Sequence, residues 1–140
     1  LMAHASVQRG MVYGISHRFA WQGSTNPSGL WAWWDRFGIR EADMRGYWMP
    51  DCPVKTGDPA VKATAYVRPG QRTAIAVASW APDRVTVRLD IDWAAMGLTP
   101  SAVQIRVPAI PGFQEALPDV DLDALPIAPD QGWILELTAI

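Results

Sequence analysis

The chain has 140 residues, of which 49% are hydrophobic and 19% charged, and its formal net charge is −2. This composition predicts one globular domain and excludes an intrinsically disordered chain. The 12 basic residues do not outnumber the 14 acidic ones, so no basic surface attracts a phosphate backbone and we expect no nucleic-acid partner. No apolar run reaches the roughly 18 residues of a membrane span, so we expect no membrane partner either.

Cysteine and histidine are scarce, which limits the possible metal and disulfide chemistry. The single Cys52 excludes an internal disulfide and forms no zinc-ligand spacing with His4 and His17, so we expect no metal and no cofactor. Cys52 has no basic neighbour before Lys55, which favours a small packed thiol over a nucleophile. The cellular compartment stays open. The first residue is Leu1 rather than methionine, which favours a fragment of a longer protein.

The first fifty residues predict a strand, a loop and a helix. Residues 10–15 form a short apolar run that is typical of a buried strand. Ser28 is a candidate N-cap for a helix over residues 30–37, and Gly38 suits the position after its end. The helix carries an apolar stripe at the spacing i, i+3, i+4 and i+7, formed by Leu30, Trp33, Trp34 and Phe37. One strand and one helix cannot bury a core, so the stripe needs either the β-rich remainder of this chain or an absent segment as its neighbour.

The remaining residues, 51–140, predict antiparallel strands. Three strands are expected over residues 61–67, 73–80 and 84–92, joined by turn residues as a meander. In the third strand the apolar side chains should face the core, namely Val85, Val87, Leu89 and Ile91. A helical turn closed by Gly97 and strands over residues 103–107 and 133–138 follow. The expected fold is therefore mainly β, a small antiparallel β-sandwich preceded by a strand-loop-helix segment.

An ordered series of short motifs carries a family resemblance across most of the chain. The series runs through Met11-Val12-Tyr13-Gly14, Leu30-Trp31, Trp34-Asp35-Arg36-Phe37-Gly38-Ile39, Gly46-Tyr47-Trp48, Pro53-Val54-Lys55-Thr56, Val61-Lys62-Ala63-Thr64, Ala78-Ser79-Trp80, Ile91-Asp92-Trp93, Gly97-Leu98 and Phe113-Gln114. It resembles the C-terminal end of a glycoside-hydrolase-like family related to family 123. The resemblance implies a (β/α)8 barrel that carries the sugar chemistry, followed by a C-terminal antiparallel β-sandwich.

The resemblance also implies how this chain divides. Residues 1–50 would be the end of the barrel, with its last strand at residues 11–15 and its last outer helix at residues 29–37, and residues 51–140 would be the sandwich. The apolar stripe of the helix would then pack on the absent barrel. Active sites of such barrels lie at the C-terminal ends of the strands, which makes His17, Arg18 and Trp21 the candidate substrate-binding residues, beside Ser16. A lone histidine such as His17 is also commonly structural.

Glycoside hydrolysis normally requires two carboxyl groups, one of which holds its proton at working pH. The three carboxylates of the first half, Asp35, Glu41 and Asp43, lie on or after the helix rather than at a strand end. We therefore predict that no catalytic residue lies in this chain. The acidic run of Asp119, Asp121 and Asp123 fits calcium-loop patterns poorly, which favours a solvated loop.

Tryptophan can stack on sugar rings or fill a core, and the chain has eight. Five follow helix or strand periodicity, which favours core packing: Trp33, Trp34, Trp80, Trp93 and Trp133. Trp21 lies in a polar loop, where cleft lining and packing are equally compatible with its position. Trp48 precedes Pro50 at the boundary of the two halves, where it is expected to join them.

We therefore expect the C-terminal portion of a glycoside hydrolase, in which the sandwich supports the catalytic barrel and the chain alone is inactive. Its expected partners are the remainder of the parent chain and, through the parent barrel, a carbohydrate. The alternative is a carbohydrate-binding or purely structural β-sandwich module. The rings of Trp80, Trp93 and Trp133 discriminate between these, because a binding module would expose at least two of them in one plane.

Overall fold

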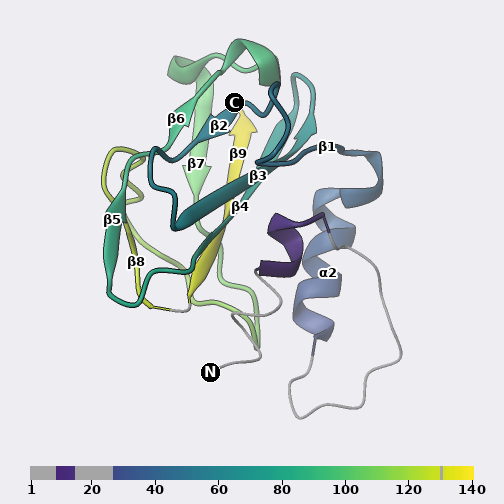
Figure 1. The fold of residues 1–140 in the computed structure, drawn as a ribbon. Coiled ribbons are helices and arrows are strands. Elements are labelled where there is room, and N and C mark those ends of the chain that lie inside the picture. Colours follow the sequence, from purple (N-terminus) through teal and green to yellow (C-terminus); the bar gives the residue numbers. More distant parts are fainter. Residues whose placement is uncertain (1–8, 15–26, 130) are drawn as a thin grey trace.

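The computed structural model describes residues 9–14, 27–129 and 131–140, which form a mainly β, sandwich-like fold around one five-stranded antiparallel sheet (Figure 1). The sheet order is β1-β3-β4-β9-β7. The strands are β1 (Asp43–Arg45), β3 (Val61–Arg68), β4 (Arg72–Ser79), β9 (Gly132–Ala139) and β7 (Val103–Arg106). Two small sheets pair β2 (Val54–Lys55) with β6 (Asp90–Ile91) and β5 (Val85–Val87) with β8 (Leu125–Ile127). The sequence-based prediction of a mainly β, antiparallel fold is confirmed.

The hairpin of β3 and β4 is the centre of the sheet and forms as predicted. Pro69 and Gly70 make its turn, in which Gly70 has φ +72° and Gln71 N donates to Arg68 O at 3.0 Å. Glycine suits this position because positive φ costs it little. The predicted meander is wrong at its third strand, however. The free edge of β4 pairs with β9, so a segment from the C-terminal end of the chain takes the place expected for residues 84–92.

The segment predicted as one strand over residues 84–92 is two short strands, β5 and β6, which belong to different small sheets. Its alternation holds nevertheless, since Val87 and Leu89 are buried while Arg88 and Asp90 are exposed. The period-two pattern reports which side of the chain faces the core, but it does not identify the strand's partner. The 3-10 turn Ala94–Met96, closed by Gly97 at φ +67°, agrees with the predicted helical turn. A further 3-10 turn, Pro100–Ala102, leads into β7.

One face of the sheet packs on the two small sheets and forms an aliphatic core. Alternate residues of β3, β4 and β9 point to this side, among them Val61, Ile75, Val77, Leu135 and Leu137. The small sheets cover them with Val54, Val87, Leu125 and Ile127, and Leu89 joins this core from the link between β5 and β6. This arrangement of two facing antiparallel layers is what the sandwich prediction requires.

The other face of the sheet packs on helix α2 (Ser28–Phe37), as Figure 1 shows. The four stripe residues are each 5% exposed or less and lie against Tyr66, Ala74, Ala76, Ala78 and Ile134. The expectation that the stripe packs on an absent barrel is therefore wrong for these side chains, because the sheet of the same chain covers them. Of the two neighbours compatible with the sequence, the β-rich remainder of this chain is the one that packs on the stripe.

The ends of α2 differ partly from the prediction. The helix begins at Ser28, and the residue before it is Pro27, which makes no side-chain capping bond, so Ser28 is not the N-cap. Gly38 ends the helix as predicted, with φ +79° and its N–H donating to Trp34 O at 2.9 Å. Arg68 of β3 adds a hydrogen bond to Phe37 O at 3.0 Å. A 3-10 turn, Ile39–Glu41, then leads the chain into β1.

Residues 9–12 are helical, so the strand predicted over residues 10–15 is wrong where the structure describes it. Met11 and Val12 are fully buried against the helix-covered face of the sheet. Two buried polar side chains of β3 satisfy carbonyl groups of this segment, since Tyr66 donates to Met11 O at 2.5 Å and Thr64 donates to Val12 O. Tertiary contacts explain the difference, because a short apolar run suits a buried helical turn as well as a strand.

The chain division at residue 50 stays a prediction. Within the structure, β1 comes from the first fifty residues and yet pairs with β3, with Met44 opposite Tyr66. In the parts of the chain that the structure describes, no helix is long and apolar enough to cross a membrane.

Candidate functional site

The substrate-binding residues predicted from the sequence, His17, Arg18 and Trp21, lie outside the described residues, as does Ser16. Their role therefore stays a prediction. The flanking described segments end at Gly14 and resume at Pro27.

Four aromatic side chains contact one another in the described structure, and we call them the aromatic edge: Tyr13, Tyr47, Trp48 and Trp80. Tyr13 contacts Tyr47 with ring centroids 5.9 Å apart and Trp80 at 6.0 Å, both edge to face. Tyr47 in turn meets Trp48 at 5.2 Å with an interplanar angle of 87°. Tyr13 is 49% exposed and Trp48 is 51% exposed, which is unusual for rings of this size. Tyr13 and Tyr47 are 34 positions apart in the sequence, and only the tertiary structure brings them together, so no local pattern predicts their contact.

That Trp48 joins the two halves of the chain stays a prediction, and in the described structure the residue is 51% exposed. The ring lies over the backbone of Gly46. A Cβ atom added at Gly46 would come within 2.6 Å of the indole, so the approach requires glycine. Tyr47 supports the indole by its edge-to-face contact. The indole is thus held in place on one side and exposed on the other.

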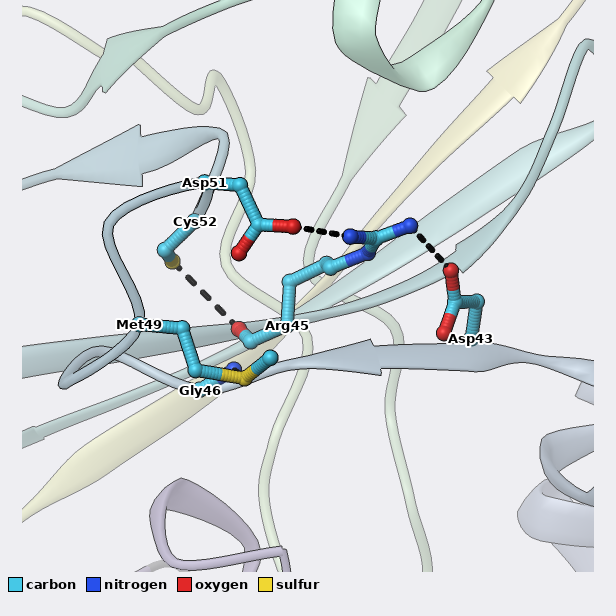
Figure 2. Close-up of polar contacts among 6 residues, drawn as sticks. All are labelled: Asp43, Arg45, Gly46, Met49, Asp51 and Cys52. Carbon is cyan, nitrogen blue, oxygen red and sulfur yellow. Dashed lines mark hydrogen bonds and ion pairs between the residues drawn. The ribbon is translucent and has the colours of Figure 1, made fainter.

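The turn that carries Trp48 is fixed by its own hydrogen bonds, of which Figure 2 draws the one from the Cys52 thiol to Arg45 O. Met49 N donates to Gly46 O at 2.9 Å, and Gly46 N donates to Met49 Sδ at 3.2 Å. Cys52 is buried, and its thiol donates to Arg45 O at 3.3 Å, which confirms the prediction of a small packed thiol. These contacts fix the backbone of the turn.

Arg45 binds the carboxylates of Asp43 and Asp51 at the outer side of the same turn (Figure 2). The hydrogen bond and charge of Asp43, followed by those of Asp51, raise the pKa of the Arg45 guanidinium. The two carboxylates compensate the arginine in a solvent-exposed cluster, which contributes little to stability.

A depression of about 450 Å³ adjoins the aromatic edge at Tyr47. Its lining comprises Tyr47, Val54, Lys55, Thr56, Gly57, Asp58, Pro59, Val61, Lys62 and Ala63. These include both lysines of the chain. Thr56 Oγ1 donates to Val61 O at 2.7 Å, and Ala60 N donates to Asp58 Oδ1 at 2.9 Å, so internal bonds hold the loop.

Tyr47 connects the depression to the aromatic edge, and Lys62 covers one of its faces. The Lys62 ammonium lies 4.7 Å from the centroid of the Tyr47 ring, within cation-π distance. Burial, followed by the hydrogen bond and charge of Tyr13, raises the pKa of the Tyr47 hydroxyl. Tyr47 therefore stays a neutral phenol that can donate or accept a hydrogen bond.

The tryptophans predicted for core packing agree with that role to different degrees. Trp33 and Trp34 are buried in the helix-covered core. Trp80, Trp93 and Trp133 are half-buried and pack against the edges of the two cores. Arg9 lies 4.9 Å from the Trp80 ring, and Trp133 Nε1 donates to Pro126 O at 2.7 Å. These three rings are neither fully buried nor a coplanar exposed platform.

The described carboxylates are distributed over the surface. Asp35, Glu41 and Asp43 are exposed, and Asp58 is the carboxylate among the residues that line the depression. Glu136 is the most enclosed acid in the described ion pairs; it accepts from Trp33 Nε1 and pairs with Arg106 at 2.9 Å. In the acidic loop, Asp119, Asp121 and Asp123 are exposed. No described residues form a group of three or more potential metal ligands from histidine, cysteine and carboxylates.

The fold and this surface define a class of protein, a small antiparallel β domain with one helix-covered face. A family model described as the C-terminal domain of glycoside hydrolase 123 matches residues 26–138. The chain belongs to this family. Neither the curated proteins nor the solved structures that were compared with the chain match it. The resemblance inferred from the ordered motifs is confirmed.

Proposed function

We propose that this chain is the C-terminal portion of a glycoside hydrolase, in which the β domain supports a catalytic (β/α)8 barrel and contributes no complete active site. The positions of the described carboxylates support this proposal. Hydrolysis uses two carboxyl groups about 5–9.5 Å apart across one sugar site. The described depression is lined by Asp58 as its carboxylate, while Glu136 is engaged by Trp33 and Arg106.

A supporting role also agrees with the packing of the domain. Both faces of its central sheet are covered within the chain, by α2 on one side and by the two small sheets on the other. Such a domain can fold around its own two cores and can hold a neighbour through its edges and loops. His17, Arg18 and Trp21 would then be among the residues that bind the sugar.

Activity of the purified 140-residue chain tests the absence of a complete site. Incubation with a panel of 4-methylumbelliferyl glycosides is expected to release no fluorescent product above the buffer blank. Release that follows the chain through purification and that falls in the Glu136→Gln or Asp58→Asn variant would contradict the proposal.

The supporting role is tested in the longer protein that the proposal requires, expressed with and without residues 27–140. Removal is expected to lower the midpoint of thermal unfolding and the soluble yield, together with hydrolysis. An unchanged midpoint and unchanged hydrolysis would contradict a supporting role. The control is a loop variant, Asp121→Asn, whose side chain is exposed and which should leave both measurements unchanged.

A further inference from the structure

We propose that the exposed face of Trp48, together with Tyr47 and the adjoining depression, binds a neutral oligosaccharide. This activity is separate from the supporting role, since it requires a ligand site on the β domain itself. Its first element is a ring that is both exposed and immobilised: Trp48 is 51% exposed, and its other side lies over Gly46. A ring that is already ordered loses little conformational entropy when a ligand stacks on it.

The chemistry of stacking favours a sugar. A pyranose ring presents a face of C–H groups, which can pack on the electron-rich face of an indole, while its hydroxyl groups point outward. The indole of Trp48 offers one open face rather than a stack of parallel rings, because Tyr47 meets it at 87°. The geometry therefore accommodates the face of a single sugar unit and does not match a flat crystalline polysaccharide surface.

The depression supplies polar groups beyond that ring. Lys55 is exposed, and Asp58 Oδ1 accepts from Ala60 N, which leaves the second oxygen of this carboxylate directed at no described donor. Tyr47 adds a neutral phenol at the boundary between the ring and the depression. An ammonium group donates hydrogen bonds, a carboxylate accepts them and a phenol does both, which matches the mixed needs of sugar hydroxyls. A volume of about 450 Å³ is within the range of ordinary small-molecule sites.

Charge around the surface favours a neutral glycan over an acidic one. Lys55 and Lys62 line the depression together with Asp58. Arg45 precedes Gly46 in the turn that carries Trp48, and it pairs with Asp43 and Asp51. Asp43 and Asp51 thus compensate Arg45, the Lys62 ammonium lies on the Tyr47 ring, and Asp58 offsets the charge of the exposed Lys55 within the depression. No net field would select a uronate or a sulfate ester.

The direct test uses the full 140-residue chain and named probes. Cellotetraose, chitotetraose and xylotetraose are titrated while the Trp48 indole N–H resonance and the backbone amides of Thr56 and Lys62 are followed by NMR. At least one of these neutral tetrasaccharides should shift all three signals together. Tetragalacturonate serves as the acidic comparison and should bind more weakly.

Two variants distinguish the site from general loss of folding. Trp48→Ala removes the stacking face, and Gly46→Ala displaces the indole, because the added Cβ would lie 2.6 Å from the ring. Gly46 does not have a positive φ, so alanine is compatible with its backbone. Both variants should keep the folded amide spectrum and weaken binding by about tenfold or more, which corresponds to about 1.4 kcal/mol. Trp93→Ala, at the margin of the other core, is the matched tryptophan control and should leave binding unchanged.

Several results would overturn the proposal. These are the absence of a Trp48 shift with every neutral probe, equal binding by Trp48→Ala, or binding of tetragalacturonate alone. Altered self-association in Trp48→Ala without any sugar response would assign the surface to a protein contact instead. The test is independent of hydrolysis, so loss of this binding site would leave the supporting role intact, and loss of the supporting role would leave this site intact.

Discussion

The two faces of the central sheet are both buried, but they differ in the size of the side chains that they present. On the face covered by the small sheets, branched aliphatic residues from both layers meet, such as Ile75 and Leu135 from the sheet and Leu125 from β8. On the helix-covered face, the sheet instead presents small residues, including Ala74, Ala76 and Ala78. On this second face the large side chains therefore come from the helix, because a close-packed interior leaves little room for large residues on both sides.

Of the substitutions that distinguish the two faces, removal of the Trp33 ring should lower the free energy of unfolding most. Trp33 is 1% exposed, stacks on Phe37 at 5.2 Å and donates to Glu136. We expect Trp33→Ala to lower the free energy of unfolding by about 3–5 kcal/mol, measured by urea denaturation. Trp48→Ala is the control, with an expected change within about 0.5 kcal/mol. A similar loss in both variants would show that the helix-covered core is not specifically required.

The aliphatic face should respond nearly as strongly to truncation. Leu135 is fully buried on β9, between the sheet and the small strands. We expect Leu135→Ala to cost about 2–5 kcal/mol by the same denaturation measurement, since it leaves a cavity that the two layers can only partly close. Gln104→Ala, at an exposed position of β7, should be nearly neutral. A neutral Leu135→Ala would refute the assignment of this face as a core.

A larger side chain on β4 tests whether the large side chains of the helix-covered core must come from the helix. Ala76 is 1% exposed beneath α2. We expect Ala76→Leu to destabilise the domain by about 1–3 kcal/mol, because the additional atoms force the helix away from the sheet or push its side chains out of favoured rotamers. Near-ultraviolet circular dichroism should also change, since tryptophans report on this packing. An unchanged spectrum with increased stability would indicate an unfilled cavity at Ala76 instead.

The smallest expected effect concerns the hydrogen bond that joins the helix-covered face to residues 9–12. Tyr66 donates to Met11 O at 2.5 Å, and we expect Tyr66→Phe to cost about 1 kcal/mol. Burial raises the pKa of Tyr66 above its ordinary value of 10.0. Its contribution is therefore fully present below pH 10 and decreases as the pH rises beyond it, because the unfolded chain ionises first.

Urea denaturation at pH 8 and near pH 11 measures this alkaline loss. Tyr66→Phe should reduce it without abolishing it, since the pKa of Tyr47 is also raised. An identical alkaline loss in the wild type and in Tyr66→Phe would contradict the role of Tyr66.

Much of the local structure was predictable where nearby residues decide it. The hairpin at Pro69-Gly70, the end of the helix at Gly38 and the inward side of Val87 and Leu89 all follow from turn chemistry or alternation. The partner of β4 was not predictable in this way, because β9 lies more than fifty residues further along the chain. The strand predicted near Met11 failed for the same reason, since tertiary burial outweighed the local pattern.

The candidate site shows the same limit. Trp48 was singled out from its position in the sequence, but its exposure and its ring contact depend on Gly46 and Tyr47. Tyr13 joins them from the segment before the helix, and Lys62 joins from β3. No spacing rule connects these residues, because they meet only after the chain has folded.

Ordered motifs and short-range periodicity are enough to specify the family, the mainly β class and the apolar sides of the helix and strands. The burial of the apolar stripe of α2 on the sheet of the same chain is a property of the folded molecule that no local pattern specifies. An apolar stripe in the sequence indicates how much helix surface must be buried away from water. The small side chains of Ala74, Ala76 and Ala78 leave room on this face of the sheet for the large side chains of the helix.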